Sequence, residues 1–165
     1  MKKCIYIFIL SSFIISCGEL KNTAEKPNYT TTVKLVNSKN FEIEQQWLFP
    51  LGGNRVNLIG NPNFIKFNKD SVDIYLPYYG VRQMGGGFSS NSGIEFKGIP
   101  KELKITPNDS KQKIDIFFKG YQDSELLTFN ITVFSNLKTS TSVTSSQRNA
   151  ISYTGELKAL QANEK

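Results

Sequence analysis

The sequence contains no histidine and only two cysteines, Cys4 and Cys17, both close to its start. The chain beyond Cys17 therefore has neither a thiol nor an imidazole. For that part of the chain this excludes thiol nucleophiles, histidine-based catalytic triads, disulfides and the usual zinc and haem ligand sets. A hard cation would need an aspartate-rich loop with calcium-type spacing, and the sequence has no such loop. We therefore expect no metal centre and no cofactor.

Long apolar runs are also scarce, and the longest lies at the start of the chain. Residues 5–15 are mostly apolar, but Ser11 and Ser12 interrupt them and a pair of lysines precedes them. A membrane-spanning helix needs about 20 predominantly apolar residues. A short apolar region after a basic start is typical of a cleaved signal peptide, which we assign to residues 1–16. A membrane-spanning anchor is the alternative interpretation.

Cys17 ends a short motif that resembles the lipobox of bacterial lipoproteins. Ile14 lies three positions before this cysteine, and the small residue Ser16 lies immediately before it. The resemblance implies cleavage after Ser16 and lipidation of Cys17. More than one acyl chain makes a stable anchor, because each buried methylene contributes about 0.8 kcal/mol. We predict that the protein contacts a membrane through this N-terminal lipid. Because no retention aspartate follows Cys17, we expect an outer-membrane location in the cell envelope.

The length of the chain suits one domain. Removal of residues 1–16 from the 165 leaves 149, which is enough to bury a substantial core. Residues 17–28 are polar and predict a tether between the lipid and the domain. We assign a single β-rich domain to residues 29–160 and a frayed tail to residues 161–165.

The charge of the chain is mildly positive. The sequence has 20 basic residues, of which two leave with the signal peptide, and 14 acidic residues, so the processed chain carries +4. Its lysines are scattered along the sequence. A nucleic-acid interface would need a basic stripe or stacked aromatic residues. We therefore predict no nucleic-acid partner and interpret the lysines as solvated surface.

The apolar spacing predicts one short helix followed by strands. Tyr29, Val33 and Val36 recur at helical spacing, with Thr30 or Thr31 as N-cap and a stop at Asn40. After Asn40 apolar and polar residues alternate, which is typical of half-buried strands. The predicted strands cover residues 41–49, 64–67, 72–76, 94–98, 103–105, 114–119, 127–133, 140–145 and 151–157.

The fold class is therefore mainly β, of the α+β type. About nine strands without intervening helices predict an antiparallel sheet, folded as a sandwich or a partly closed barrel. Turn residues separate the strands at positions 52–54, 68–70, 107–109 and 135–136. The alternation predicts a core that contains Phe41, Ile43, Trp47, Ile74, Leu76, Ile116, Phe129 and Ile131.

Two stretches of the sequence are distinctive: Leu-Pro-Tyr-Tyr-Gly at residues 76–80, and Ile-Ser-Tyr at residues 151–153, shortly after Arg148. Together they resemble a family of lipoproteins from Bacteroidota, the domain of unknown function 4251. The resemblance covers about Phe41 to Leu157. It implies a helix followed by an antiparallel sheet in a lipidated, secreted protein. The family carries no known activity, so the resemblance implies no catalytic residues.

A candidate binding surface follows the strand that Pro77 ends. Pro77 cannot donate a hydrogen bond to a sheet, so the chain enters a loop there. Large amphipathic side chains on a glycine-rich loop suit stacking on a sugar ring or docking of a peptide. Alternatively, the tyrosines cap the edge of the core and their hydroxyls bond to the backbone. The loop residues of this candidate surface are Tyr78, Tyr79, Arg82, Gly85, Gly86 and Gly87.

Arg148 and Tyr153 extend this candidate surface. Arg148 lies between two predicted strands, where a hairpin tip would expose it, and its guanidinium could hold a carboxylate with two hydrogen bonds. Alternatively, it pairs with an acidic neighbour such as Glu95 and stabilises the fold. Tyr153 follows on the next strand.

A carboxylate pair is the feature that would suit an enzyme. Glu42 and Glu44 lie two apart on one strand and so share a face, which could support acid–base hydrolysis of a glycoside. The simpler interpretation is a solvated polar face. We therefore predict a non-enzymatic envelope lipoprotein whose β-rich domain binds a lipid, a glycan or an envelope protein. A carboxylate-based hydrolase and a purely structural envelope component are the alternatives.

Overall fold

The computed structural model describes residues 28–81 and 93–160. The predicted signal peptide, almost all of the predicted tether and the predicted tail lie outside these residues. The helix and strands are α2 (Tyr29–Asn37), β1 (Asn40–Pro50), β2 (Val56–Asn57), β3 (Phe64–Asn68), β4 (Ser71–Leu76), β5 (Ile94–Gly98), β6 (Lys101–Asn108), β7 (Lys113–Gln122), β8 (Glu125–Phe134), β9 (Lys138–Ser145) and β10 (Ile151–Ala159).

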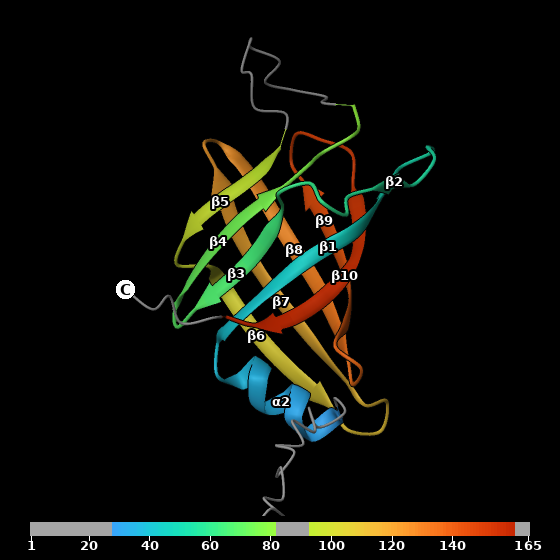
Figure 1. Cartoon of the computed structure of the whole chain (residues 1–165). Coiled ribbons are helices and arrows are strands. Elements are labelled where there is room, and N and C mark those ends of the chain that lie inside the picture. Colours follow the sequence, from blue (N-terminus) through green and yellow to red (C-terminus); the bar gives the residue numbers. More distant parts are fainter. Residues whose placement is uncertain (1–27, 82–92, 161–165) are drawn as a thin grey trace, which may run out of the picture.

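The strands form one antiparallel sheet that curls into a half-barrel (Figure 1). Nine of the ten strands follow the order β5-β4-β3-β1-β10-β9-β8-β7-β6, and the short β2 pairs with β1. The prediction of a partly closed barrel is confirmed, and the alternative of a sandwich is wrong. The strand that the sequence did not predict is β2, because two residues are too few to show alternation.

The core lies inside the curl and is rich in phenylalanine. Phe41 stacks on Phe67 with ring centroids 4.6 Å apart, and Phe118 stacks on Phe129 at 4.7 Å. Phe67 and Phe118 join the two pairs edge to face at 5.6 Å. All the predicted core residues except Trp47 are buried. These four phenylalanines therefore fill the middle of the described interior.

The prediction that Trp47 is buried is wrong because β1 contains a bulge. The register between β1 and β10 shifts between Gln45 and Trp47, so one extra residue on β1 has no partner. Such an insertion exchanges the two faces of the strand beyond it. Leu48 is therefore fully buried, whereas Trp47 turns outward and stacks on the guanidinium of Arg55 at 4.5 Å.

The helix α2 covers one end of the half-barrel, which we call the helix end (Figure 1). Its N-cap is Asn28, which the sequence had assigned to the tether, and not Thr30 or Thr31. The Asn28 side chain accepts a hydrogen bond from the Thr31 N–H, and the Thr31 hydroxyl accepts one from the Asn28 N–H. This reciprocal cap fixes the first turn. The helix ends at Asn37, and the expected stop, Asn40, instead begins β1.

Turns between neighbouring strands hold the helix in place. The Tyr29 hydroxyl donates to Asp109 Oδ1 at 2.8 Å, in the turn between β6 and β7. The Thr32 hydroxyl donates to the Ser135 carbonyl at 3.2 Å, in the turn between β8 and β9. In the described part of the chain, no helix is both long enough and apolar enough to cross a membrane.

The opposite end, which we call the loop end, carries the connections from β4 to β5, from β7 to β8 and from β9 to β10 (Figure 1). Here the two edges of the sheet approach each other. The Phe96 ring lies so close to Gly120 that an added Cβ would meet it at 2.7 Å, and the Glu95 N–H donates to Gln122 Oε1 at 3.1 Å. Side chains thus close the seam between β5 and β7 at this end.

Candidate functional site

The loop end collects the predicted site residues that the structure describes. Tyr78 and Tyr79 follow β4, Arg148 lies in the connection from β9 to β10, and Tyr153 lies on β10. The remaining predicted positions lie outside the described residues: Cys17, Arg82, Gly85, Gly86 and Gly87. The described residues divide into a buried group and an exposed group.

Arg148 and Glu125 form the centre of the buried group. Each side chain is 1% exposed. Arg148 Nε lies 2.8 and 3.0 Å from the two oxygens of Glu125, and Arg148 Nη2 donates to Glu125 Oε2 at 2.8 Å. This is the side-on, two-point pairing that a planar guanidinium makes with a carboxylate.

The same guanidinium connects further segments of the loop end. Its Nη1 donates to the Gly93 carbonyl at 2.8 Å, just before β5. Its Nη2 donates to Gln122 Oε1 at 3.1 Å, at the end of β7. Glu125 also accepts a short hydrogen bond from the Ser145 hydroxyl. Arg148 therefore ties together the connections of three strand pairs, and its charge is matched inside the protein.

One expectation about Arg148 is wrong, and the alternative, a pairing with an acidic neighbour that stabilises the fold, is confirmed. Arg148 is not exposed at a hairpin tip, because the connection folds inward. The hydroxyl oxygen of Ser145 accepts hydrogen bonds from the backbone N–H groups of Gln147 and Arg148 at 2.8 and 3.1 Å. Its acidic partner is Glu125, not Glu95. Glu125 begins β8 on the buried face that Leu127 and Phe129 continue, so extension of the alternation by two residues would have located it.

Tyr78 and Tyr153 complete the buried group. The Tyr153 hydroxyl donates to the Pro77 carbonyl at 2.7 Å, and the Tyr78 hydroxyl lies 3.1 and 3.2 Å from the carbonyls of Val81 and Asn149. The Arg148 guanidinium lies 5.2 Å from the centre of the Tyr78 ring. Burial raises the pKa of both phenols above the usual value for tyrosine. Tyr78 is thus placed as the alternative interpretation expects, at the edge of the core with a backbone-bonded hydroxyl, whereas Tyr79, the other tyrosine of that interpretation, is exposed.

The exposed group contains the predicted Tyr79 and further side chains that the sequence analysis did not single out. Tyr79 is 54% exposed, Val81 is 65% exposed and Leu51 is 73% exposed. Leu51 and Phe49 line a hollow of about 260 Å³ at the end of β1, together with Ala150. The backbone of Val81 lies near this hollow, because its carbonyl accepts the N–H of Asn149, the neighbour of Ala150. We call Phe49, Leu51, Tyr79 and Val81 the loop-end patch.

One signal in the sequence could have located Leu51. It is a large apolar residue directly before Gly52 and Gly53, and a turn there leaves no core position for its side chain. The approach of Val81 to the same surface has no such signal. It depends on contacts between segments that lie far apart in the sequence.

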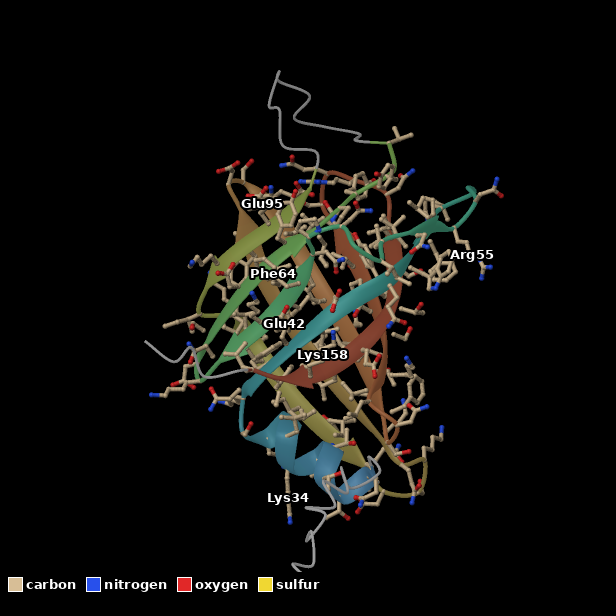
Figure 2. The ribbon with its side chains drawn as sticks, viewed as in Figure 1. Lys34, Glu42, Arg55, Phe64, Glu95 and Lys158 are labelled. Carbon is tan, nitrogen blue, oxygen red and sulfur yellow. The ribbon has the colours of Figure 1, made fainter. Side chains whose placement is uncertain are left out.

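Glu42 and Glu44, the carboxylate pair considered for a hydrolase, lie on the outer face of β1. Glu42 pairs with Lys66 at 3.5 Å, and Glu44 pairs with Lys158 at 2.5 Å. Figure 2 shows Glu42 and Lys158 on this outer face. The hydrogen bond to Glu44 raises the pKa of Lys158. Neighbouring lysines therefore engage both carboxylates, as expected for a solvated polar face.

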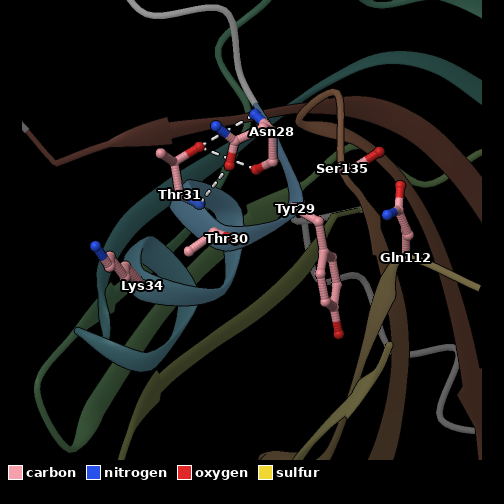
Figure 3. Close-up of a pocket in the computed structure, with 7 residues that line it drawn as sticks. All are labelled: Asn28, Tyr29, Thr30, Thr31, Lys34, Gln112 and Ser135. Atoms are coloured by element: carbon pink, nitrogen blue, oxygen red, sulfur yellow. Dashed lines mark hydrogen bonds between the residues drawn. The ribbon is translucent and has the colours of Figure 1, made fainter. Parts of the chain in front are cut away.

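A second hollow, of about 560 Å³, lies at the start of α2 (Figure 3). Its lining is mainly polar and includes Asn28, Tyr29 and Lys34. The reciprocal cap between Asn28 and Thr31 already uses the first polar groups of the helix. The described residues contain no group of three or more aspartate, glutamate, histidine or cysteine side chains that could hold a metal ion.

Comparison with known proteins identifies the family of this domain. Residues 23–157 match the family described as Domain of unknown function (DUF4251). The chain belongs to the DUF4251 family. The match includes α2 and so begins before Phe41, where the resemblance read from the sequence began.

The half-barrel is also found in a solved DUF4251 structure. The chain is similar to the crystal structure of a DUF4251 family protein from Bacteroides eggerthii DSM 20697 at 1.95 Å resolution, with a TM-score of 0.61 and 15% identity. The similarity covers 79% of this chain and 87% of that chain, and at this identity it shows the fold. No similar protein is found among curated proteins. Membership in DUF4251 therefore establishes a β domain and assigns it no activity.

Proposed function

We propose that this DUF4251 protein is anchored by lipid in the cell envelope, at the outer membrane. Its β domain binds a partner and is not an enzyme. The motif Ile14-Ile15-Ser16-Cys17 carries the anchor half of the proposal, because it combines an aliphatic residue, a small residue and the acylated cysteine in the required order. The loop-end patch carries the binding half.

An envelope protein is the partner that suits the loop-end patch. Soluble proteins expose single apolar residues routinely, but adjoining apolar residues around a hollow are typical of interaction sites. Leu51 and Val81 are aliphatic, and Phe49 and Tyr79 add aromatic area. A glycan would instead need several polar groups around an aromatic face. A lipid would need an internal cavity, and phenylalanines occupy the described interior of the half-barrel.

The two alternatives of a hydrolase and a purely structural component have less support. A glycoside hydrolase needs two carboxylates that face one substrate. Glu42 and Glu44 instead each pair with a lysine on the outer face. A purely structural component would need no exposed apolar patch at the loop end, so substitutions in the patch distinguish it from a binding domain.

The lipid anchor is tested by metabolic labelling. Cells supplied with an alkyne analogue of palmitate should label the wild-type protein and not Cys17→Ala, which should also leave the membrane fraction or remain uncleaved. Equal label in both proteins would refute the anchor. Density-gradient separation of inner and outer membranes then tests the predicted location.

The binding surface is tested by crosslinking in cells. A photoreactive amino acid at Tyr79 should yield a discrete crosslinked product, and Leu51→Ser with Val81→Ser should abolish it. Tyr75 is the matched control, because it is a tyrosine of 40% exposure on the outer wall of β4. Crosslinks of equal yield from positions 75 and 79, or a product that survives the double substitution, would place the binding surface elsewhere.

A further inference from the structure

The described charged residues are not distributed evenly between the two ends of the half-barrel. On the walls of the sheet, lysines pair with carboxylates, as Lys66 does with Glu42 and Lys97 with Asp73. Among the described residues five lysines make no ion pair: two, Lys101 and Lys104, lie on β6, and three, Lys34, Lys69 and Lys111, belong to the helix end.

The three lysines of the helix end lie on parts of it that are fixed to one another. Lys34 is on the exposed face of α2 and points away from the sheet (Figure 2). Lys69 is exposed in the turn between β3 and β4, and its N–H donates to the carbonyl of Lys39, directly after α2. Lys111 is exposed in the turn between β6 and β7, which Tyr29 binds through Asp109.

Few carboxylates offset these charges. Asp70 pairs with a further lysine of this end, Lys39, at 3.2 Å, and Asp109 accepts the hydrogen bond from Tyr29. The helix end thus has four lysines against two aspartates. At the loop end, the described carboxylates Glu95 and Asp123 make no ion pair with a described residue, and neither does the exposed Arg55 in the turn beyond β1. The described part of the helix end therefore carries more positive charge than the described part of the loop end.

The tether reaches the domain at the positive end. Asn28, the N-cap of α2, follows Cys17 by 11 residues. A chain of that length spans at most about 40 Å when fully extended. A lipid on Cys17 would therefore keep the helix end close to the bilayer and make its contact with the headgroups an intramolecular event at high effective concentration.

We propose that the helix end docks on the anionic headgroups of the bilayer that holds the lipid anchor, through the ammonium groups of Lys34, Lys69 and Lys111. This inference rests on the proposed lipid anchor. The loop end then points away from the bilayer and presents the loop-end patch to its partner. Each lysine near an anionic surface shifts the docked population about five-fold. The attraction is electrostatic, so it weakens as salt shortens the screening length to about 3 Å at 1 M.

The test uses the purified, lipidated full chain in vesicles. The processed chain has no cysteine other than the acylated Cys17, so one introduced cysteine carries one donor dye. Asn37→Cys places the dye at the exposed end of α2, and Asn54→Cys places it in the exposed turn beyond β1 at the loop end. Energy transfer to an acceptor on the lipid headgroups then reports which end faces the membrane.

Vesicles of phosphatidylcholine alone are compared with vesicles that also contain phosphatidylglycerol. The anionic lipid should raise transfer from position 37 and not from position 54, and 1 M salt should remove the gain. Lys34→Glu should cut the docked population at least about five-fold. Lys104→Glu is the matched control, because it makes the same charge change at an exposed lysine on the wall strand β6 that has no ion pair with a described residue.

The possible outcomes separate the two proposals. If the protein stays on the vesicles but energy transfer from position 37 does not depend on lipid charge, the docking proposal is overturned and the lipid anchor stands. An equal effect of Lys104→Glu and Lys34→Glu overturns the assignment of the contact to the helix end. Protein that does not stay with phosphatidylcholine vesicles overturns the lipid anchor and this inference with it.

Discussion

Replacement of Arg148 by methionine should destabilise the domain strongly. The substitution removes the guanidinium but keeps an unbranched apolar chain, so it creates little empty space. Glu125 then remains 1% exposed without its cation, and the carbonyl of Gly93 and the amide oxygen of Gln122 each lose a donor. Removal of one partner from a buried ion pair typically costs about 3–5 kcal/mol.

That cost is a large part of the total stability of the domain. Native domains are stable by about 5–15 kcal/mol. With a urea dependence of about 2 kcal/mol per M, a loss of 4 kcal/mol lowers the midpoint of unfolding by about 2 M. Urea titration followed by tryptophan fluorescence measures the shift, because the sequence has one tryptophan, Trp47.

Two further variants separate the loss of the ion pair from a general disturbance of the loop end. Arg148→Lys keeps the charge but not the planar fork, so it should cost less than Arg148→Met. Arg148→Met combined with Glu125→Leu removes both charges and should recover a substantial part of the loss, because an apolar pair needs no compensation. A loss below about 1 kcal/mol for Arg148→Met, as at exposed ion pairs, would refute the buried pairing.

Three further outcomes follow from the core and the loop end. Phe129→Ala should cost about 3–5 kcal/mol in urea titration, because Phe129 is fully buried and stacked on Phe118. Gly155→Ala should prevent the native pairing of β1 with β10, seen as loss of cooperative unfolding, because an added Cβ would meet the Glu44 carbonyl oxygen at 2.2 Å. The free energy of unfolding should fall as pH rises above about 10, because burial raises the pKa of Tyr78 and Tyr153 in the folded protein. The unfolded chain therefore loses these protons at a lower pH than the folded protein does. Tyr153→Phe should make this alkaline loss of stability less steep. Near-native stability of Phe129→Ala or Gly155→Ala, or an alkaline decline that Tyr153→Phe leaves unchanged, would contradict the respective assignment.

The alternation of apolar and polar residues determined most of the fold. A strand exposes successive side chains on opposite faces, so residues such as Ile74, Ile116 and Phe129 reveal a buried face without knowledge of the neighbouring strand. The absence of helical periodicity after Asn40 likewise indicated an antiparallel sheet. These are local properties, and they also carry the predictions about Cys17, because a signal peptide is recognised as a linear motif.

Local patterns failed where the chain deviates from regular geometry. The bulge between Gln45 and Trp47 depends on the pairing of β1 with β10, which is more than 100 residues away, and it alone turned Trp47 outward and Leu48 inward. The N-cap at Asn28 was missed for a smaller reason. Thr30 and Thr31 offered equivalent caps, and the backbone geometry selected Asn28, which precedes them.

The loop end shows most clearly what only the tertiary structure decided. The sequence marked Tyr78, Arg148 and Tyr153 as chemically interesting, but which side chains bind ligands and which stabilise the fold depends on burial and on partners from other strands. Packing placed Glu125 against Arg148, and the hydroxyls of Tyr78 and Tyr153 form hydrogen bonds with backbone carbonyls. It also brought the backbone of Val81 near the hollow that Leu51 lines, and it left the side chains of both residues exposed. Residue types thus indicated which chemical groups this end contains, whereas the curl of the sheet determined which of these side chains face solvent.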